Sequence, residues 1–301
     1  MQSGGIGIGE LAAVGTALLW TLSTLAWTSA GKQVGALAVS FVRLVITCVF
    51  LLAYGRLVRG LWLPSDASRE TWVVLGASGV VGFFLADICL FKAFLLIGPR
   101  LTLLFQSLAP PFTAILSWLL LDDPLGPKDW LAMLVTLAGV SWVVLERPNG
   151  PATPHSRRDE VWGMFLAVVG ALGQAGGLVL SKEGIGDYDA VAGTFIRVLG
   201  AMVGYLIVIT LLGRWAAMLA VARHGRVMLV MTYGALVGPF LGVALSLVAV
   251  RHCHAGVAAT IINTMPVLIL PIAVVVYKEK VSLRAAAGAV VSVVGVAFLV
   301  L

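Results

Sequence analysis

Residues 101–123 read LTLLFQSLAPPFTAILSWLLLDD, and residues 257–279 read VAATIINTMPVLILPIAVVVYKE. The two stretches align without a gap at an offset of 156 residues, which places Pro110 on Pro266 and Asp123 on Glu279. Each is an apolar run that ends in an acid, and an apolar run of about 20 residues is what a helix needs to cross a bilayer. The chain therefore holds two versions of one membrane-spanning unit.

The repeat continues outside these two stretches. Further matches are Gly82 with Gly238, Gly139 with Gly295, and residues 40–44 (SFVRL) with residues 194–198 (TFIRV). We predict a first five-helix repeat at residues 1–146, a linker at 147–159 and a second five-helix repeat at 160–301. Because five is odd, the second half enters the membrane from the opposite side, and this inverted repeat is a plan that many secondary transporters share.

Composition excludes a soluble protein. Hydrophobic residues make up 60% of the chain and charged residues 11%, whereas a soluble domain has about 25% charged residues. We expect an all-α integral membrane protein with ten transmembrane helices. Their predicted ranges are 10–30, 36–56, 71–92, 101–121, 128–146, 160–181, 190–213, 227–249, 256–277 and 283–301. The net charge of +6 is then a feature of loops at lipid headgroups, and no soluble region remains for nucleic-acid binding.

The late part of each half resembles a known family. In the first half the motif is Ala93, then 108–110 (LAP), then 119–123 (LLLDD); in the second it is Ala249, then 263–266 (NTMP), then 276–279 (VYKE). With Trp20 in the first helix, these residues resemble the ten-helix EamA-type branch of the drug/metabolite transporter superfamily. Two departures are the Asp122–Asp123 pair in place of a glutamate, and a glycine-rich sixth helix without a tryptophan.

The resemblance implies a function and a location. It implies secondary transport of small organic solutes by alternating access, with export of amino acids or related metabolites. It implies a central cavity lined by helices one, three, four, six, eight and nine, and an inner or plasma membrane with both chain ends in the cytoplasm. The partners are then the small-molecule substrate and the lipid bilayer, and the sequence does not determine the oligomeric state.

Polar residues at membrane depth are costly and mark cavities or functional sites. The candidates to line the cavity are Trp20, Thr24, Asp87, Gln106, Gln174, Tyr233 and Asn263. Asp87 is a candidate for proton coupling, and it could equally pair with Lys92 or Arg100. Arg43 and Arg197 occupy equivalent places in the second and seventh helices. They either contact a substrate anion or serve structure by snorkelling to headgroups.

Two prolines are predicted to interrupt helices. Pro110 and Pro266 each lack a backbone N–H, which leaves the carbonyl four residues earlier, that of Gln106 or Ile262, without its helical donor. These positions are candidate hinges or substrate contacts, and a purely structural kink is the alternative.

Other classes of function lack their motifs. We expect no catalytic residues, no metal ligands and no cofactor, because His, Asp and Glu do not cluster as an intramembrane enzyme requires and no P-loop is present. A non-transporting scaffold or a channel remains open as an alternative, and an intramembrane enzyme is a less favoured one.

The charges of the loops conflict with the orientation that the resemblance implies. With both chain ends in the cytoplasm, the inner loops would hold Arg56, Arg59, Arg69, Lys128, Lys182 and Arg251. The outer loops would hold at least Arg147, Arg157, Arg158, Arg214, Arg223 and Arg226. Cytoplasmic loops normally carry the excess of Lys and Arg, so the loop charges disagree with this orientation. We keep the orientation that the resemblance implies, with both chain ends in the cytoplasm, as the expectation.

Overall fold

The computed structural model describes residues 7–146, 157–275 and 282–300, and these form helices and turns without a strand. Nine helical stretches within the described ranges are long and apolar enough to cross a membrane, and a shorter apolar one covers Ala255–Pro271. They coincide with the ten predicted spans, which confirms the ten-helix membrane fold. The third span continues to Gly98, six residues beyond its predicted end.

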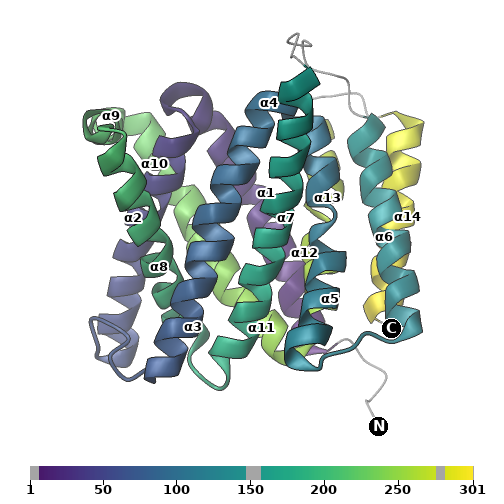
Figure 1. The fold of residues 1–301 in the computed structure, drawn as a ribbon, viewed down its shortest axis with the longest axis horizontal. Coiled ribbons are helices and arrows are strands. Elements are labelled where there is room, and N and C mark those ends of the chain that lie inside the picture. Colours follow the sequence, from purple (N-terminus) through teal and green to yellow (C-terminus); the bar gives the residue numbers. More distant parts are fainter. Residues whose placement is uncertain (1–6, 147–156, 276–281, 301) are drawn as a thin grey trace.

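The helices follow in a simple order. They are α1 (Ile8–Val34), α2 (Ala36–Tyr54), η1 (Gly55–Arg59), α3 (Arg69–Gly79), η2 (Val80–Leu85), α4 (Ala86–Gln106), α5 (Ala109–Leu121), α6 (Pro127–Glu146), α7 (Arg157–Ile185), α8 (Ala190–Leu211), α9 (Trp215–Val221), α10 (Gly225–Ala235), η3 (Leu236–Gly242), α11 (Val243–His252), α12 (Ala255–Ile262), α13 (Met265–Val275) and α14 (Leu283–Val300). Helix α1 begins and α14 ends at one face, at the bottom of Figure 1, which we call the terminal face.

The helices of one half pack mainly against those of the other, in matched pairs. The first span, α1, packs on the eighth (α10, η3 and α11), as the third span packs on the sixth through α4 and α7. Helix α5 packs on α12, α2 on α8, and α6 on α14. Figure 1 shows the α6–α14 pair at one end of the molecule and α2 with α9 at the other. This two-fold pattern is that of an inverted repeat.

Helical continuity is interrupted at matched places in the two halves. The third and eighth spans each contain a π-helical segment, η2 and η3, and these align at the offset of 156 residues. The fourth span breaks after Gln106 and the ninth after Ile262, at equivalent positions just before the predicted prolines. Proline at the start of a helix is favourable because its missing N–H has no partner there anyway. The π-helical segments were not predicted.

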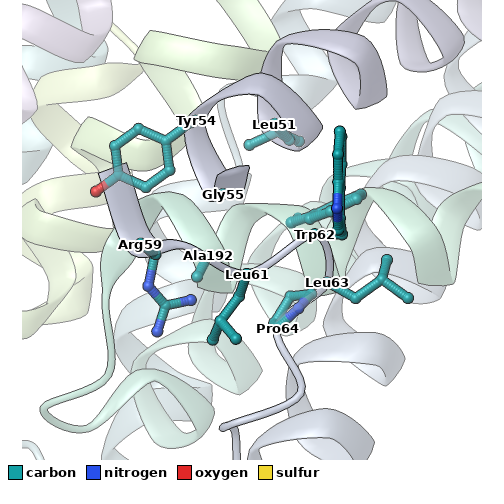
Figure 2. Close-up of a pocket in the computed structure, with 10 residues that line it drawn as sticks. Leu51, Tyr54, Gly55, Arg59, Leu61, Trp62, Leu63, Pro64 and Ala192 are labelled. Atoms are coloured by element: carbon teal, nitrogen blue, oxygen red, sulfur yellow. The ribbon is translucent and has the colours of Figure 1, made fainter. Parts of the chain in front are cut away.

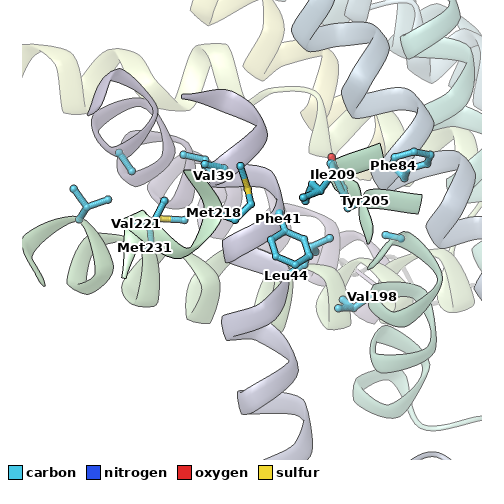
Figure 3. Close-up of a cluster of buried hydrophobic side chains, with 14 of the residues drawn as sticks. Val39, Phe41, Leu44, Phe84, Val198, Tyr205, Ile209, Met218, Val221 and Met231 are labelled. Carbon is cyan, nitrogen blue, oxygen red and sulfur yellow. The ribbon is translucent and has the colours of Figure 1, made fainter. Parts of the chain in front are cut away.

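A core of apolar side chains holds α2, α8 and α9 together. Phe41 and Leu44 of α2 pack with Tyr205 of α8 and with Met218 and Val221 of α9 (Figure 3). Each of these five side chains is less than 10% exposed. The short helix α9 does not cross the membrane, and its two buried side chains fix it against α2 and α8.

Glycines allow α6 and α14 to touch through their backbones. A Cβ atom placed on Gly139 would lie 2.4 Å from the backbone nitrogen of Ser292 and 2.6 Å from the carbonyl oxygen of Gly288. In lipid, where apolar surface gives no hydrophobic drive between helices, such close packing is what associates them.

We therefore expect Gly139→Ala to destabilise the protein by about 1–3 kcal/mol through overpacking. The control is Gly76→Ala, also inside a span, whose added Cβ meets nothing within 4 Å and gains helix propensity. The measurement is the thermal unfolding midpoint of the purified variants. An equal midpoint for both variants would contradict the close-packing assignment.

Candidate functional site

Two amide side chains meet where the fourth span breaks. Gln106 is the last residue of α4, Gln174 lies in α7 of the other half, and the Gln106 Nε2 donates a hydrogen bond to Gln174 Oε1 at 3.1 Å. Both side chains are half-buried. The structure thus brings together two of the residues proposed from the sequence, across the interface between the halves.

The ninth span breaks in the same way around Asn263. Its Nδ2 donates to the Ala259 carbonyl at 3.4 Å, and the Thr264 hydroxyl donates to the Ile261 carbonyl at 2.7 Å. Pro110 and Pro266 lie in the first turns of the helices that follow, α5 and α13, so neither can donate to the carbonyl four residues earlier. Polar backbone at matched positions of two spans is the arrangement that binds solutes in other inverted-repeat proteins.

The remaining cavity candidates lie on the first and eighth spans. Trp20 is half-buried and packs into the space that Gly242 leaves open, where an added Cβ would come within 2.6 Å of its ring. Thr24 is exposed, and its hydroxyl donates to the Trp20 carbonyl at 2.7 Å. Tyr233 on α10 is 49% exposed, and among the described residues no hydrogen bond joins it to the Gln106–Gln174 pair.

Asp87 forms an ion pair with Arg43 and, among the described side chains, none with Lys92; the side chain of Arg100, the other partner weighed in the sequence analysis, lies outside the described ones. The pair joins the second and third spans at membrane depth. The Arg43 guanidinium also lies 5.8 Å from the centre of the Trp27 ring. Arg43 is therefore already neutralised in this conformation, which weakens its case as a substrate contact.

Tyr205 completes this cluster, and the sequence analysis did not select it. Its hydroxyl donates to the Phe83 carbonyl at 3.2 Å and interacts with Asp87. Phe83 belongs to the π-helical segment η2, where the hydrogen-bond pattern of the helix changes. One signal in the sequence could have identified Tyr205. It follows Arg197 by about two helical turns and so lies on the same face of α8.

Arg197 has a different environment from its repeat counterpart Arg43. Its side chain is 3% exposed, so it does not snorkel, and its guanidinium lies 4.4 Å from the centre of the Phe83 ring. Within the described part of the chain it forms no ion pair, and its Nε has no hydrogen-bond partner. The counterpart of Asp87 in the second half is Val243, which explains the missing carboxylate.

Asp123 ties the two halves together at the terminal face. Its carboxylate forms ion pairs with Lys182 at the end of α7 and with His254 in the turn before α12. It also accepts from the Ser117 hydroxyl at 2.8 Å and from the backbone N–H of Ala255 at 3.2 Å. Burial alone would raise the pKa of Asp123, but the bonds from Lys182, Ser117 and His254 prevail and lower it to about 2. The repeat counterpart, Glu279, and residues 147–156 of the predicted linker lie outside the described residues.

A second polar cluster closes the same face near the end of the second span. Arg59 pairs with Asp66, and the Tyr188 hydroxyl of the other half donates to Asp66 Oδ1 at 2.9 Å. Arg251 donates to the Tyr188 carbonyl. The Tyr54 hydroxyl donates to Asp189, also of the other half, at 3.1 Å.

Two spaces lie at this face, one very small and one an open cleft. Beside Tyr54 and Arg59 only about 10 Å³ remains, enough for one water molecule (Figure 2). A wider cleft of about 260 Å³ lies between α3 and the end of α7, lined by Glu70, Glu183 and Asp187 among others. In the described ranges no His, Cys, Asp and Glu side chains group in a way that could hold a metal ion.

Comparisons with known proteins identify one family. The model of the EamA-like transporter family matches residues 7–145 and again 161–301. No curated protein matches the chain. A solved structure described only as the crystal structure of a protein superposes with a TM-score of 0.75 at 20% identity, over 96% of this chain and 95% of that one. At this identity the likeness supports the fold alone.

Asp123→Asn should lower the unfolding midpoint at pH 7, because the loss of the charge weakens bonds worth about 1–3 kcal/mol. An unfolded Asp titrates near pH 3.9, so the contribution of Asp123 is full above about pH 4 and is lost as the pH falls towards about 2. Thermal unfolding between pH 7 and pH 2 measures both effects. The matched control is Asp122→Asn, since Asp122 is exposed and Asn tolerates its left-handed backbone (φ 49°). Equal losses in the two variants would contradict the role of Asp123.

Arg43→Gln and Asp87→Asn should each destabilise strongly, by about 3–5 kcal/mol, because each leaves one buried charge without its partner. The double variant is neutral at both positions and should recover a large part of that loss. The unfolding midpoints of the wild type, the two single variants and the double variant give the coupling free energy between Arg43 and Asp87. Losses that simply add would show that Arg43 and Asp87 do not act as a pair.

Proposed function

The chain belongs to the EamA-like transporter family, and from that premise we propose that it is a secondary transporter that exports amino acids or related small metabolites by alternating access. We place it in the inner or plasma membrane as a multi-pass protein. Its orientation there is a separate matter, since the family expectation and the loop charges disagree.

The observation that carries this proposal is the pair of broken spans with polar groups at the breaks. Gln106 and Gln174 meet across the halves, and Asn263 stands at the equivalent break of the ninth span. Amides both donate and accept hydrogen bonds, so they suit a solute that carries an amine and a carboxylate. In the proposed mechanism the glutamines exchange their mutual bond for bonds to the solute.

Alternating access requires that one face be closed while the other opens. The bonds that Asp123, Asp66 and Asp189 accept from residues of the other half all lie at the terminal face. This conformation therefore corresponds to a state closed at the terminal face. Movement of the halves past each other breaks these contacts and opens that face.

Two further roles follow for the charged residues of the spans. Asp87 is the proposed proton-coupling group, because protonation would release it from Arg43. Arg197 is the proposed contact for a solute carboxylate, because its charge has no counter-ion in the described part of the structure. A carboxylate that approached it would form a charge-assisted bond.

Transport is best tested by counterflow in liposomes with a panel of labelled amino acids and related metabolites. Wild-type protein should show saturable exchange of some members. Gln106→Leu and Gln174→Leu should each reduce the initial rate by about tenfold, because each removes one solute contact and leaves its partner amide unsatisfied. Gln33→Leu is the control, since Gln33 is an exposed amide at the end of α1 and should retain the wild-type rate.

Two outcomes would contradict the proposal. Folded wild-type protein without saturable exchange across the panel would favour a scaffold or an untested solute class. Equal losses in all three glutamine variants would remove the Gln106–Gln174 pair from the solute path.

A further inference from the structure

The segment around α9, residues 211–226, stands at the face opposite the terminal face (Figure 1). It joins α8 to α10 and carries three exposed arginines, Arg214, Arg223 and Arg226. We call these residues the α9 segment. Its composition combines exposed cations with exposed apolar side chains, which is the pattern of helices that lie in a membrane interface.

The apolar side chains of the α9 segment divide between the protein and the outside. Met218 and Val221 are buried in the core, whereas Leu211 is 79% exposed and Leu219 is 71% exposed. Trp215 packs edge-on against Phe41, with 5.8 Å between ring centres. Tryptophan at this depth and leucines facing outward fix the segment at the level where hydrocarbon meets headgroups.

The arginines of the α9 segment have no acid near them in the sequence. The sequence has neither Asp nor Glu at residues 190–278. In the described ranges none of Arg214, Arg223 and Arg226 forms an ion pair. Their guanidinium groups are thus available for phosphate oxygens, which they bind through paired N–H donors.

Three cations of the terminal face have partners of their own. Arg59 pairs with Asp66, Lys182 pairs with Asp123, and Arg251 donates to a backbone carbonyl. That face also carries further acids, in turns and at helix ends: Glu70, Asp122, Asp129, Glu183, Asp187 and Asp189. It is therefore the poorer surface for anionic lipid, and the two faces differ in the sign of their net charge.

We propose that the α9 segment docks on anionic phospholipid headgroups of the cytoplasmic leaflet, which places both chain ends outside the cytoplasm. Anionic lipid is concentrated in that leaflet and attracts basic segments next to membrane spans. The excess of arginine at this face also sets orientation during insertion. This orientation is the reverse of the one that the family resemblance favours, and it does not depend on the transported solute.

Orientation is measured with single cysteines in a chain whose native Cys48, Cys89 and Cys253 are replaced by Ala. Ser65→Cys lies in an exposed turn of the terminal face, and Ala217→Cys lies on the exposed side of α9. In intact cells a membrane-impermeant maleimide should label the cysteine at 65, whereas the one at 217 should react only after the cells are opened. Labelling of 217 alone in intact cells would overturn the proposal.

Lipid docking is measured on purified protein equilibrated with equal amounts of phosphatidylglycerol and phosphatidylcholine, followed by native mass spectrometry of retained lipid. The test variant replaces Arg214, Arg223 and Arg226 by Gln, and the control replaces Arg56, Arg69 and Lys128 of the terminal face by Gln. We expect the test variant to lose phosphatidylglycerol enrichment by at least about fivefold and the control to keep it.

Equal enrichment in the two triple variants would refute the docking surface even if the labelling supports the orientation. Because all six substituted side chains are exposed, both variants should keep the wild-type unfolding midpoint. The labelling experiment decides the orientation whether or not the test variant folds, since it leaves the arginines in place.

Discussion

Inside a bilayer every backbone polar group has to find a partner within the protein, and this constraint governs the positions where the helices of this chain are irregular. Residues 107–108 and 263–264 interrupt the fourth and ninth spans, and η2 and η3 interrupt the third and eighth. The side chains that lie at or beside these interruptions are polar: Gln106, Gln174, Asn263 and the hydroxyl of Tyr205. The polar interior is therefore a consequence of where the helices break, and the proposed solute contacts lie at the same level.

The two halves are alike in architecture and unlike in charge. By the repeat, Asp123 corresponds to Glu279, but its partner His254 corresponds to Gly98, which carries no charge. An inverted repeat lets each face close by the same motion. In the described part of the chain, the ion pairs of Asp123 lie at the terminal face, so under the proposed alternating access they would favour the state that is closed at that face.

Most of the fold could be predicted from the sequence, and the main contacts of the candidate site could not. Hydropathy predicted the ten spans, and the missing N–H groups of Pro110 and Pro266 predicted that the fourth and ninth spans are interrupted. The pairing of Arg43 with Asp87 depends on how the second and third spans are placed by the helices around them, which no local pattern encodes. The π-helical segment η2 likewise lies where Gly82 and Gly177 bring two backbones into contact, a feature of packing between helices.

The comparison of Arg43 with Arg197 shows how one repeat diverges into two roles. Both arginines lie at the same place in their halves, and a buried charge without a partner is expensive in either. Asp87 neutralises Arg43, while Val243 at the equivalent position leaves Arg197 with only the face of Phe83. An aromatic ring compensates a cation incompletely. A state in which an anion from the solute supplies the missing charge would lower this cost. The difference between Asp87 and Val243 is thus the basis for the two proposed roles, an ion pair that protonation can release at Arg43 and a solute contact at Arg197.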